Sequence, residues 1–144
     1  MAIAYGADAV YLAGEHFGMR SFAGNFDEVA LLEAAALCKA RGVSLHVTCN
    51  SMPRNDEVAK LPHFLALLEH AGVSAVVLAE VGVLGLCKRY APSVKIHIST
   101  QASVVNYESA AAFYDLGASR VILARELSLT EIEVIRRKAP QELE

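Results

Sequence analysis

Short apolar runs alternate along the whole chain with segments in which apolar residues recur at helical spacing. Most of the runs follow a glycine and lead into polar residues. The strands that they predict are Ala7–Ala13, Val43–Asn50, Ser74–Ala79, Lys95–Gln101 and Arg120–Arg125. Because each intervening helix returns the chain to the same end of the sheet, this alternation is typical of parallel strands. The polar strand ends then meet at one rim, where parallel α/β proteins place their binding sites.

We therefore predict an α/β fold of parallel βα repeats, an incomplete (partial) TIM-type barrel with about five strands. A closed barrel has eight strands and takes about 250 residues, whereas this chain has 144. The last predicted helix, Leu129–Lys138, has no predicted strand after it. We expect residues 1–142 to be the N-terminal barrel domain of a longer protein, and residues 143–144 to be an expression-tag remnant outside the fold. A small open sheet that is complete in itself is the alternative.

The composition excludes several classes of function. Hydrophobic residues make up 54% of the chain and charged residues 20%, and the net charge of −3 comes without the basic cluster of a nucleic-acid binding segment. No stretch has the length of a membrane span or the features of a secretory signal. The three cysteines form no Cys-x-x-Cys pair, so neither a disulfide framework nor a zinc site is indicated. These features predict a soluble cytoplasmic protein.

Side chains alternate between the two faces of a strand, so each predicted strand presents two sets of residues. The aliphatic set should pack against the helices, and the other set should point into the barrel interior. In the second and fourth strands this interior set has seven polar residues: His46, Thr48, Asn50, Lys95, His97, Ser99 and Gln101. Polar groups inside a barrel cost free energy unless they bond to one another or to a ligand. The pattern indicates a binding site, and a structural histidine pair is the alternative.

The candidate substrate-binding residues lie in the strands, at their ends or in the loops after them. They are Asn50, His97, Ser99, Gln101, Arg125 and Arg20. Arg20 is expected either to bind an anion or to be solvated on the surface. Arg125 is expected either to line the rim of the site or to form an ion pair with Glu126. No metal site is predicted, because no carboxylate stands at ligand spacing from the histidines. No catalytic residue is assigned, because the sequence has no HExxH, GxSxG or Walker motif.

A set of segments carries a family resemblance: Gly6-Ala-Asp-Ala-Val-Tyr-Leu12, Phe17-Gly18-x-Arg20, Asn25-Phe26, Val47-Thr48-x-Asn50, His97-Ile-Ser-Thr-Gln101 and Arg125-Glu-Leu-Ser-Leu129-x-x-Ile132. Together they resemble the collagenase-like "unassigned" peptidases, the thirty-second family of that series. The resemblance covers almost the whole chain. It implies a barrel-like N-terminal region whose first strand normally ends in Pro-Ala-Gly, and this chain begins just after that point.

The resemblance also implies a function. Family members were first described as peptidases or collagenases, and the better-understood ones resemble oxygen-independent hydroxylation factors for transfer or ribosomal RNA or for ubiquinone synthesis. That chemistry is associated with a 4Fe-4S cluster on four cysteines and, in the RNA branch, with prephenate. The family's cysteines lie downstream of the Arg125 segment, so Cys38, Cys49 and Cys87 are not expected to be cluster ligands. No cofactor is expected within this chain.

We expect a truncated N-terminal portion, inactive alone, of an iron–sulfur-dependent hydroxylation or RNA-modification enzyme. A peptidase and a non-catalytic binding or assembly domain are the alternatives. The partner of the whole protein would be RNA or a small-molecule substrate. The chain itself is expected to form a homo-oligomer, because Ala7–Ala13 and Arg120–Arg125 would be unpaired edge strands.

Overall fold

The computed structural model describes residues 1–19, 24–140 and 142–144, and its strands form one parallel six-stranded sheet. The strands are β1 (Ala9–Ala13), β2 (Ser44–Cys49), β3 (Ala75–Leu78), β4 (Lys95–Ile98), β5 (Arg120–Val121) and β6 (Glu142–Leu143). Their order in the sheet is their order in the sequence. A doubly wound sheet reverses its strand order partway, whereas a barrel adds each strand beside the last. The predicted incomplete TIM-type barrel is confirmed.

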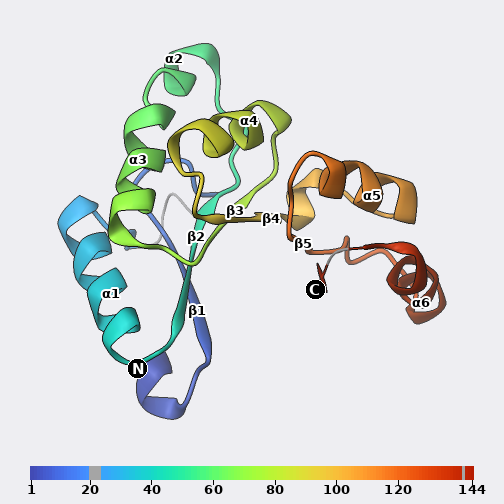
Figure 1. The fold of residues 1–144 in the computed structure, drawn as a ribbon, viewed down its shortest axis with the longest axis horizontal. Helices are drawn as coiled ribbons and strands as arrows, with labels where there is room; N and C mark the ends of the chain where they lie inside the picture. Colours follow the sequence, from blue (N-terminus) through green and yellow to red (C-terminus); the bar gives the residue numbers. More distant parts are fainter. Residues whose placement is uncertain (20–23, 141) are drawn as a thin grey trace.

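Helices connect the strands and follow one another around the outside of the sheet, as Figure 1 shows. They are η1 (Ala2–Tyr5), α1 (Glu28–Ala40), α2 (Asn55–Val58), α3 (Leu61–Ala71), α4 (Val81–Tyr90), η2 (Thr100–Ala102), α5 (Tyr107–Asp115) and α6 (Leu129–Lys138). Among the described residues no pairing joins β1 to β6, so the sheet is open. In the same part of the chain, no helix has the length and apolar character needed to cross a membrane.

The hydrophobic core lies between the sheet and the helices. Along β2, Leu45, Val47 and Cys49 are buried while the intervening residues are only half-buried, as the alternation of side chains predicts. Leu78 of β3 and Ile98 of β4 are fully buried in the same core. Burying one such side chain stabilises a fold by about 1.5–3 kcal/mol. The helix-facing side of the sheet therefore holds the fold together.

Side chains at the helix starts accept hydrogen bonds from backbone N–H groups that have no partner inside the helix. Asn106 caps α5, and Ser128 forms the predicted capping box of α6 with Glu131. The Glu80 carboxylate accepts hydrogen bonds from the backbone N–H groups of Gly82 and Val83 at 2.9 and 3.0 Å. Because of this cap, α4 begins at Val81, earlier than predicted.

Two strands end several residues earlier than predicted. β4 stops at Ile98 rather than Gln101, because the Ser99 hydroxyl accepts a hydrogen bond from the Gln101 N–H at 3.3 Å and starts η2. β5 spans only Arg120–Val121. Arg125 therefore lies in a connecting segment, away from the end of the strand.

A sixth strand forms at Glu142–Leu143, which the sequence analysis did not expect. It pairs in parallel with β5, and Leu143 packs against the core. The prediction that Arg120–Arg125 is an edge strand is therefore wrong, because β5 has a neighbour on each side. β1 pairs only with β2 among the named strands, and a single bridge joins Gly14 to Phe26 just beyond its end. Self-association through a strand edge stays a prediction.

Candidate functional site

A row of side chains crosses the sheet on the side away from the helices. The strand register aligns Thr48 with Val77 and Val77 with His97. It then aligns His97 with Arg120, and Arg120 with Glu142. Aligned residues of parallel strands share a face of the sheet. This inner face is therefore mostly polar, in contrast to the apolar face beneath the helices.

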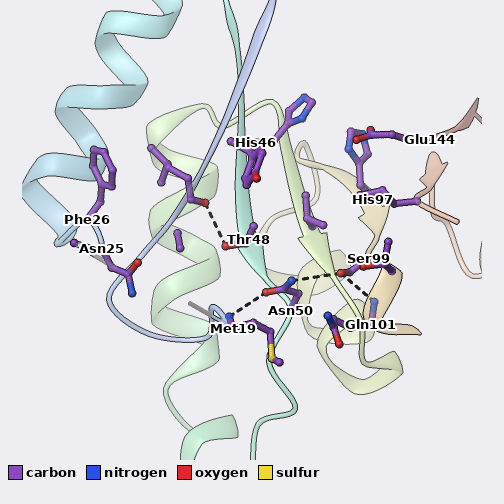
Figure 2. Close-up of a pocket in the computed structure, with 17 residues that line it drawn as sticks. Met19, Asn25, Phe26, His46, Thr48, Asn50, His97, Ser99, Gln101 and Glu144 are labelled. Carbon is purple, nitrogen blue, oxygen red and sulfur yellow. Dashed lines mark hydrogen bonds between the residues drawn. The ribbon is translucent and has the colours of Figure 1, made fainter. Parts of the chain in front are cut away.

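A cavity of about 510 Å³ opens on the inner face near the carboxyl ends of β1, β2 and β4. This volume lies within the usual range for small-molecule sites. The cavity brings together six of the polar residues that the sequence analysis assigned to the interior: His46, Thr48, Asn50, His97, Ser99 and Gln101. Figure 2 shows these side chains around one space, with Met19 and Phe26 from the segment between β1 and α1. The predicted face of His97 is confirmed.

His46 and His97 form an edge-to-face ring pair with centroids 4.9 Å apart. His97 is 3% exposed. Burial, followed by the positive charge of Arg120 and by His46, lowers the pKa of His97 to about 4. Burial and Arg120 also lower the pKa of His46. Both imidazoles are therefore neutral at pH 7, and each ring offers one N–H donor and one acceptor nitrogen.

Asn50 connects three segments at the cavity. Its Oδ1 accepts a hydrogen bond from the backbone N–H of Met19 at 3.3 Å. Its Nδ2 donates to Ser99 Oγ at 3.3 Å, and the same Oγ accepts the N–H of Gln101. Dashed lines in Figure 2 mark these bonds. Asn50 therefore ties the segment after β1 to the ends of β2 and β4.

Arg120 lies on the same face but is already paired. Its Nη2 donates to Glu142 Oε2 at 2.6 Å, and its Nη1 donates to Glu144 Oε2 at 3.1 Å. The hydrogen bond from Arg120 lowers the pKa of Glu142. Sequence reasoning missed this group because both carboxylates lie in the segment around β6. The sequence could have placed Arg120 on the inner face, because it precedes the buried Val121 in the strand and neighbouring side chains point to opposite faces.

The two arginines in the predicted site do not join this cavity. Arg125 is exposed and lines a separate space of about 370 Å³ together with Leu127 and Arg136. Arg20 lies outside the described residues. Of the predicted site residues, the structure therefore groups Asn50, His97, Ser99 and Gln101 and separates Arg125 from them.

The three cysteines do not suit an iron–sulfur cluster. All are buried, and burial raises the pKa of Cys49 to about 12, that of Cys87 to about 11 and also that of Cys38. A cluster ligand must be a thiolate, which such pKa values disfavour. Within the described residues, no group of three or more His, Cys, Asp or Glu side chains is arranged to hold a metal ion.

An open α/β barrel with helices outside and a polar cavity on its inner side defines the class of this protein. The chain belongs to Peptidase family U32, whose match covers residues 1–144. The resemblance found in the sequence motifs is thereby confirmed.

Relatives in this family include RNA hydroxylation proteins. The chain is 35% identical over 144 residues to tRNA hydroxylation protein P1 of Bacillus subtilis, covering 100% of this chain and 34% of that protein. It is 33% identical over 144 residues to the 23S rRNA 5-hydroxycytidine C2501 synthase of Escherichia coli, covering 99% of this chain and 21% of the relative. The chain thus spans about a third or less of these two relatives.

A solved structure, that of the U32 peptidase Mk0906, has a similar fold. Its TM-score is 0.76 at 20% identity, over 96% of this chain and 60% of that chain. At this level of identity the similarity concerns the fold.

Proposed function

We propose that this chain is the N-terminal, substrate-binding part of an RNA hydroxylation protein and is inactive on its own. One observation carries the proposal: the inner cavity gathers uncharged hydrogen-bonding groups from β2, β4 and η2 in a space large enough for a small molecule. Such a site binds and orients a substrate. The relatives named for tRNA and rRNA hydroxylation support RNA as that substrate.

Hydroxylation is an oxidation, and the described residues offer no redox group for it. The buried thiols of Cys49 and Cys87 have raised pKa values and do not fit a cluster. We therefore place a 4Fe-4S cluster on cysteines outside these 144 residues, in a longer protein that works in the cytoplasm. The length of the relatives, about three times that of this chain for the Bacillus subtilis protein, is consistent with this arrangement.

The geometry does not favour a peptidase. A hydrolytic serine needs a base within hydrogen-bond reach of its hydroxyl. Ser99 Oγ is instead bonded to Asn50 and to the Gln101 N–H. The Cys49 thiol belongs to the helix-facing core and has a pKa of about 12, so it is not a nucleophile at pH 7. We expect no cleavage of casein or denatured collagen by the purified chain.

The test is deletion of the gene for the full-length protein, followed by mass spectrometry of the nucleosides of tRNA and rRNA. We expect one hydroxylated nucleoside to disappear and to return when the wild-type gene is restored. Restoration with the variant His70→Asn, which changes an exposed histidine of α3, should work as well as wild type. RNA with an unchanged nucleoside content after deletion would refute the proposed function.

A further inference from the structure

The buried face of the cavity contains hydrogen-bonding groups that have no partner among the described residues. His97 is 3% exposed and lines the cavity, yet neither of its ring nitrogens makes a hydrogen bond to any described residue. His46 is half-buried beside it and likewise makes no hydrogen bond to a described residue, although its ring packs edge-to-face against His97. Buried polar groups in proteins are nearly always satisfied, and an exception needs an explanation. A bound ligand that fills the cavity would supply the missing partners.

The charges around the cavity define what this ligand can be. Arg120 is aligned with His97 in the sheet, and it is already bonded to Glu142 and Glu144. Glu144 lines the cavity, and its carboxylate is paired with Arg120. No Lys or Arg occurs among the described residues that line it. Among these described residues a phosphate or carboxylate would find no unpaired cation to replace its hydration, whereas an uncharged ligand loses less free energy on leaving water.

The cavity walls favour a flat ring. Apolar side chains from four segments line the space beside the polar groups: Tyr11, Met19, Phe26, Val77 and Ile122. Apolar walls pack against the faces of a ring, and neutral imidazoles can exchange donor and acceptor hydrogen bonds with its edge. Enzymes that act on a nucleobase read an unstacked base in this way, by its hydrogen-bonding edge and by packing on its faces.

We infer that this cavity takes the uncharged base of one unstacked nucleotide, with His97 and His46 hydrogen bonding to the edge of the base. The inference deepens the proposed function and rests on it for the choice of RNA. Asn50 acts as a positioning residue, because its bonds to Met19 and Ser99 hold the cavity entrance together. The phosphates of the substrate would lie outside the cavity.

The test is a nuclear magnetic resonance titration of the full-length protein with selectively labelled histidine rings. The probes are cytidine and uridine, with ribose, inorganic phosphate and malonate as comparison ligands. We expect the nucleosides to shift the ring signals of His97 and His46 while the signals of the exposed His63 and His70 stay in place. The three comparison ligands should leave all four rings unshifted at the same concentrations.

Two variants with matched controls measure the contribution of the rings. His97→Asn and, separately, His46→Asn should weaken nucleoside binding by about 5- to 10-fold, the effect of losing one or two neutral hydrogen bonds. His70→Asn should bind like wild type. Circular dichroism melts show which variants are folded. If a variant does not fold, the titration of the wild-type protein still tests the inference.

The outcomes separate this inference from the proposed function. Shifts caused by phosphate or malonate but not by nucleosides would overturn the inference, as would ribose acting as well as the nucleosides. If RNA loses a hydroxylated nucleoside on gene deletion while nucleosides leave His97 unshifted, the function stands and the base pocket is wrong. If nucleosides shift His97 while RNA is unaffected by deletion, the base pocket stands and the proposed function is wrong.

Discussion

The two faces of the sheet differ most clearly along β4, where neighbouring residues point to opposite sides. Ile98 is completely buried in the helix-facing core, and His97 on the inner face is almost as buried. Ile98 belongs to the hydrophobic core, whereas His97 has ring nitrogens without hydrogen-bond partners in the described structure. Similar burial therefore has different consequences: the apolar face stabilises the fold, whereas the inner face buries a polar ring that no described residue satisfies.

The largest effect should come from the helix-facing side. Ile98→Ala removes a fully buried side chain and leaves a cavity, so we expect the free energy of unfolding to fall by about 2–5 kcal/mol. His97→Asn, one position away, should change it by less than about 1 kcal/mol at pH 7, because it removes a neutral group without hydrogen bonds. Chemical denaturation measures both. Equal losses for the two variants would contradict the division between the faces.

The second effect is a loss of stability in mild acid. The pKa of His97 is lowered from 6.5 to about 4, so between these values the unfolded chain binds a proton that the folded protein does not. The protein is thus free of this penalty above pH 6.5 and loses stability as the pH falls toward 4, because protonation then favours the unfolded chain. The loss should reach on the order of 3 kcal/mol.

Denaturation curves measured from pH 7 to pH 4 check this effect. His97→Asn should flatten the decline, because the variant has no ring to protonate at this position. His70→Asn, at an exposed histidine on α3, serves as the control. A wild-type decline that His97→Asn fails to reduce would show that other groups cause it.

A smaller effect is expected at the entrance of the cavity. Asn50→Ala removes the hydrogen bonds to Met19 and Ser99, both 3.3 Å long, and should lower the free energy of unfolding by about 1 kcal/mol. Amide exchange at Met19 should become faster, because its N–H loses its acceptor. Asn55→Ala on the exposed start of α2 serves as the control. Unchanged exchange at Met19 would rule out the proposed connection.

The smallest effect should come from the ion pairs of Arg120. Glu142→Gln should change stability very little, because the carboxylate is exposed to solvent and an exposed ion pair contributes little. It should nevertheless lower the pKa of His97 further, since the negative charge of Glu142 raises it. Glu133→Gln, which breaks the exposed pair with Arg137 on α6, should leave that pKa unchanged. Ring titration by nuclear magnetic resonance measures the difference.

The alternation of side chains was enough to predict the parallel strands and the face of His97, because helix packing selects the aliphatic side of each strand. The ends of the strands were harder to predict. Ser99 continues the alternating pattern of the strand, so the sequence predicts it as part of β4. Its hydroxyl instead caps η2, and local hydrogen bonds of this kind compete with sheet pairing. That competition also removed Gln101 from the strand.

Residues whose structure depends on distant partners were missed. Leu143 belongs to a segment that is too short to show a strand-like alternation of polar and apolar residues. The segment forms a strand only because the edge of β5 is free to pair with it. Arg125 looked like a strand end because the run Val121–Ala124 is apolar, but β5 stops at Val121. The pairing of Arg120 with Glu142 depends on that same contact and has no local signature.

The sequential order of the strands has a consequence for how this protein folds on the ribosome. Each strand from β2 onward pairs with the strand that was synthesised just before it. A nascent chain can therefore extend the sheet by one βα unit at a time, without waiting for a distant segment. Because β2 carries His46 and β4 carries His97, the two rings can meet before the ribosome has made α6. Pulling force measured on stalled nascent chains should rise stepwise as each helix leaves the exit tunnel.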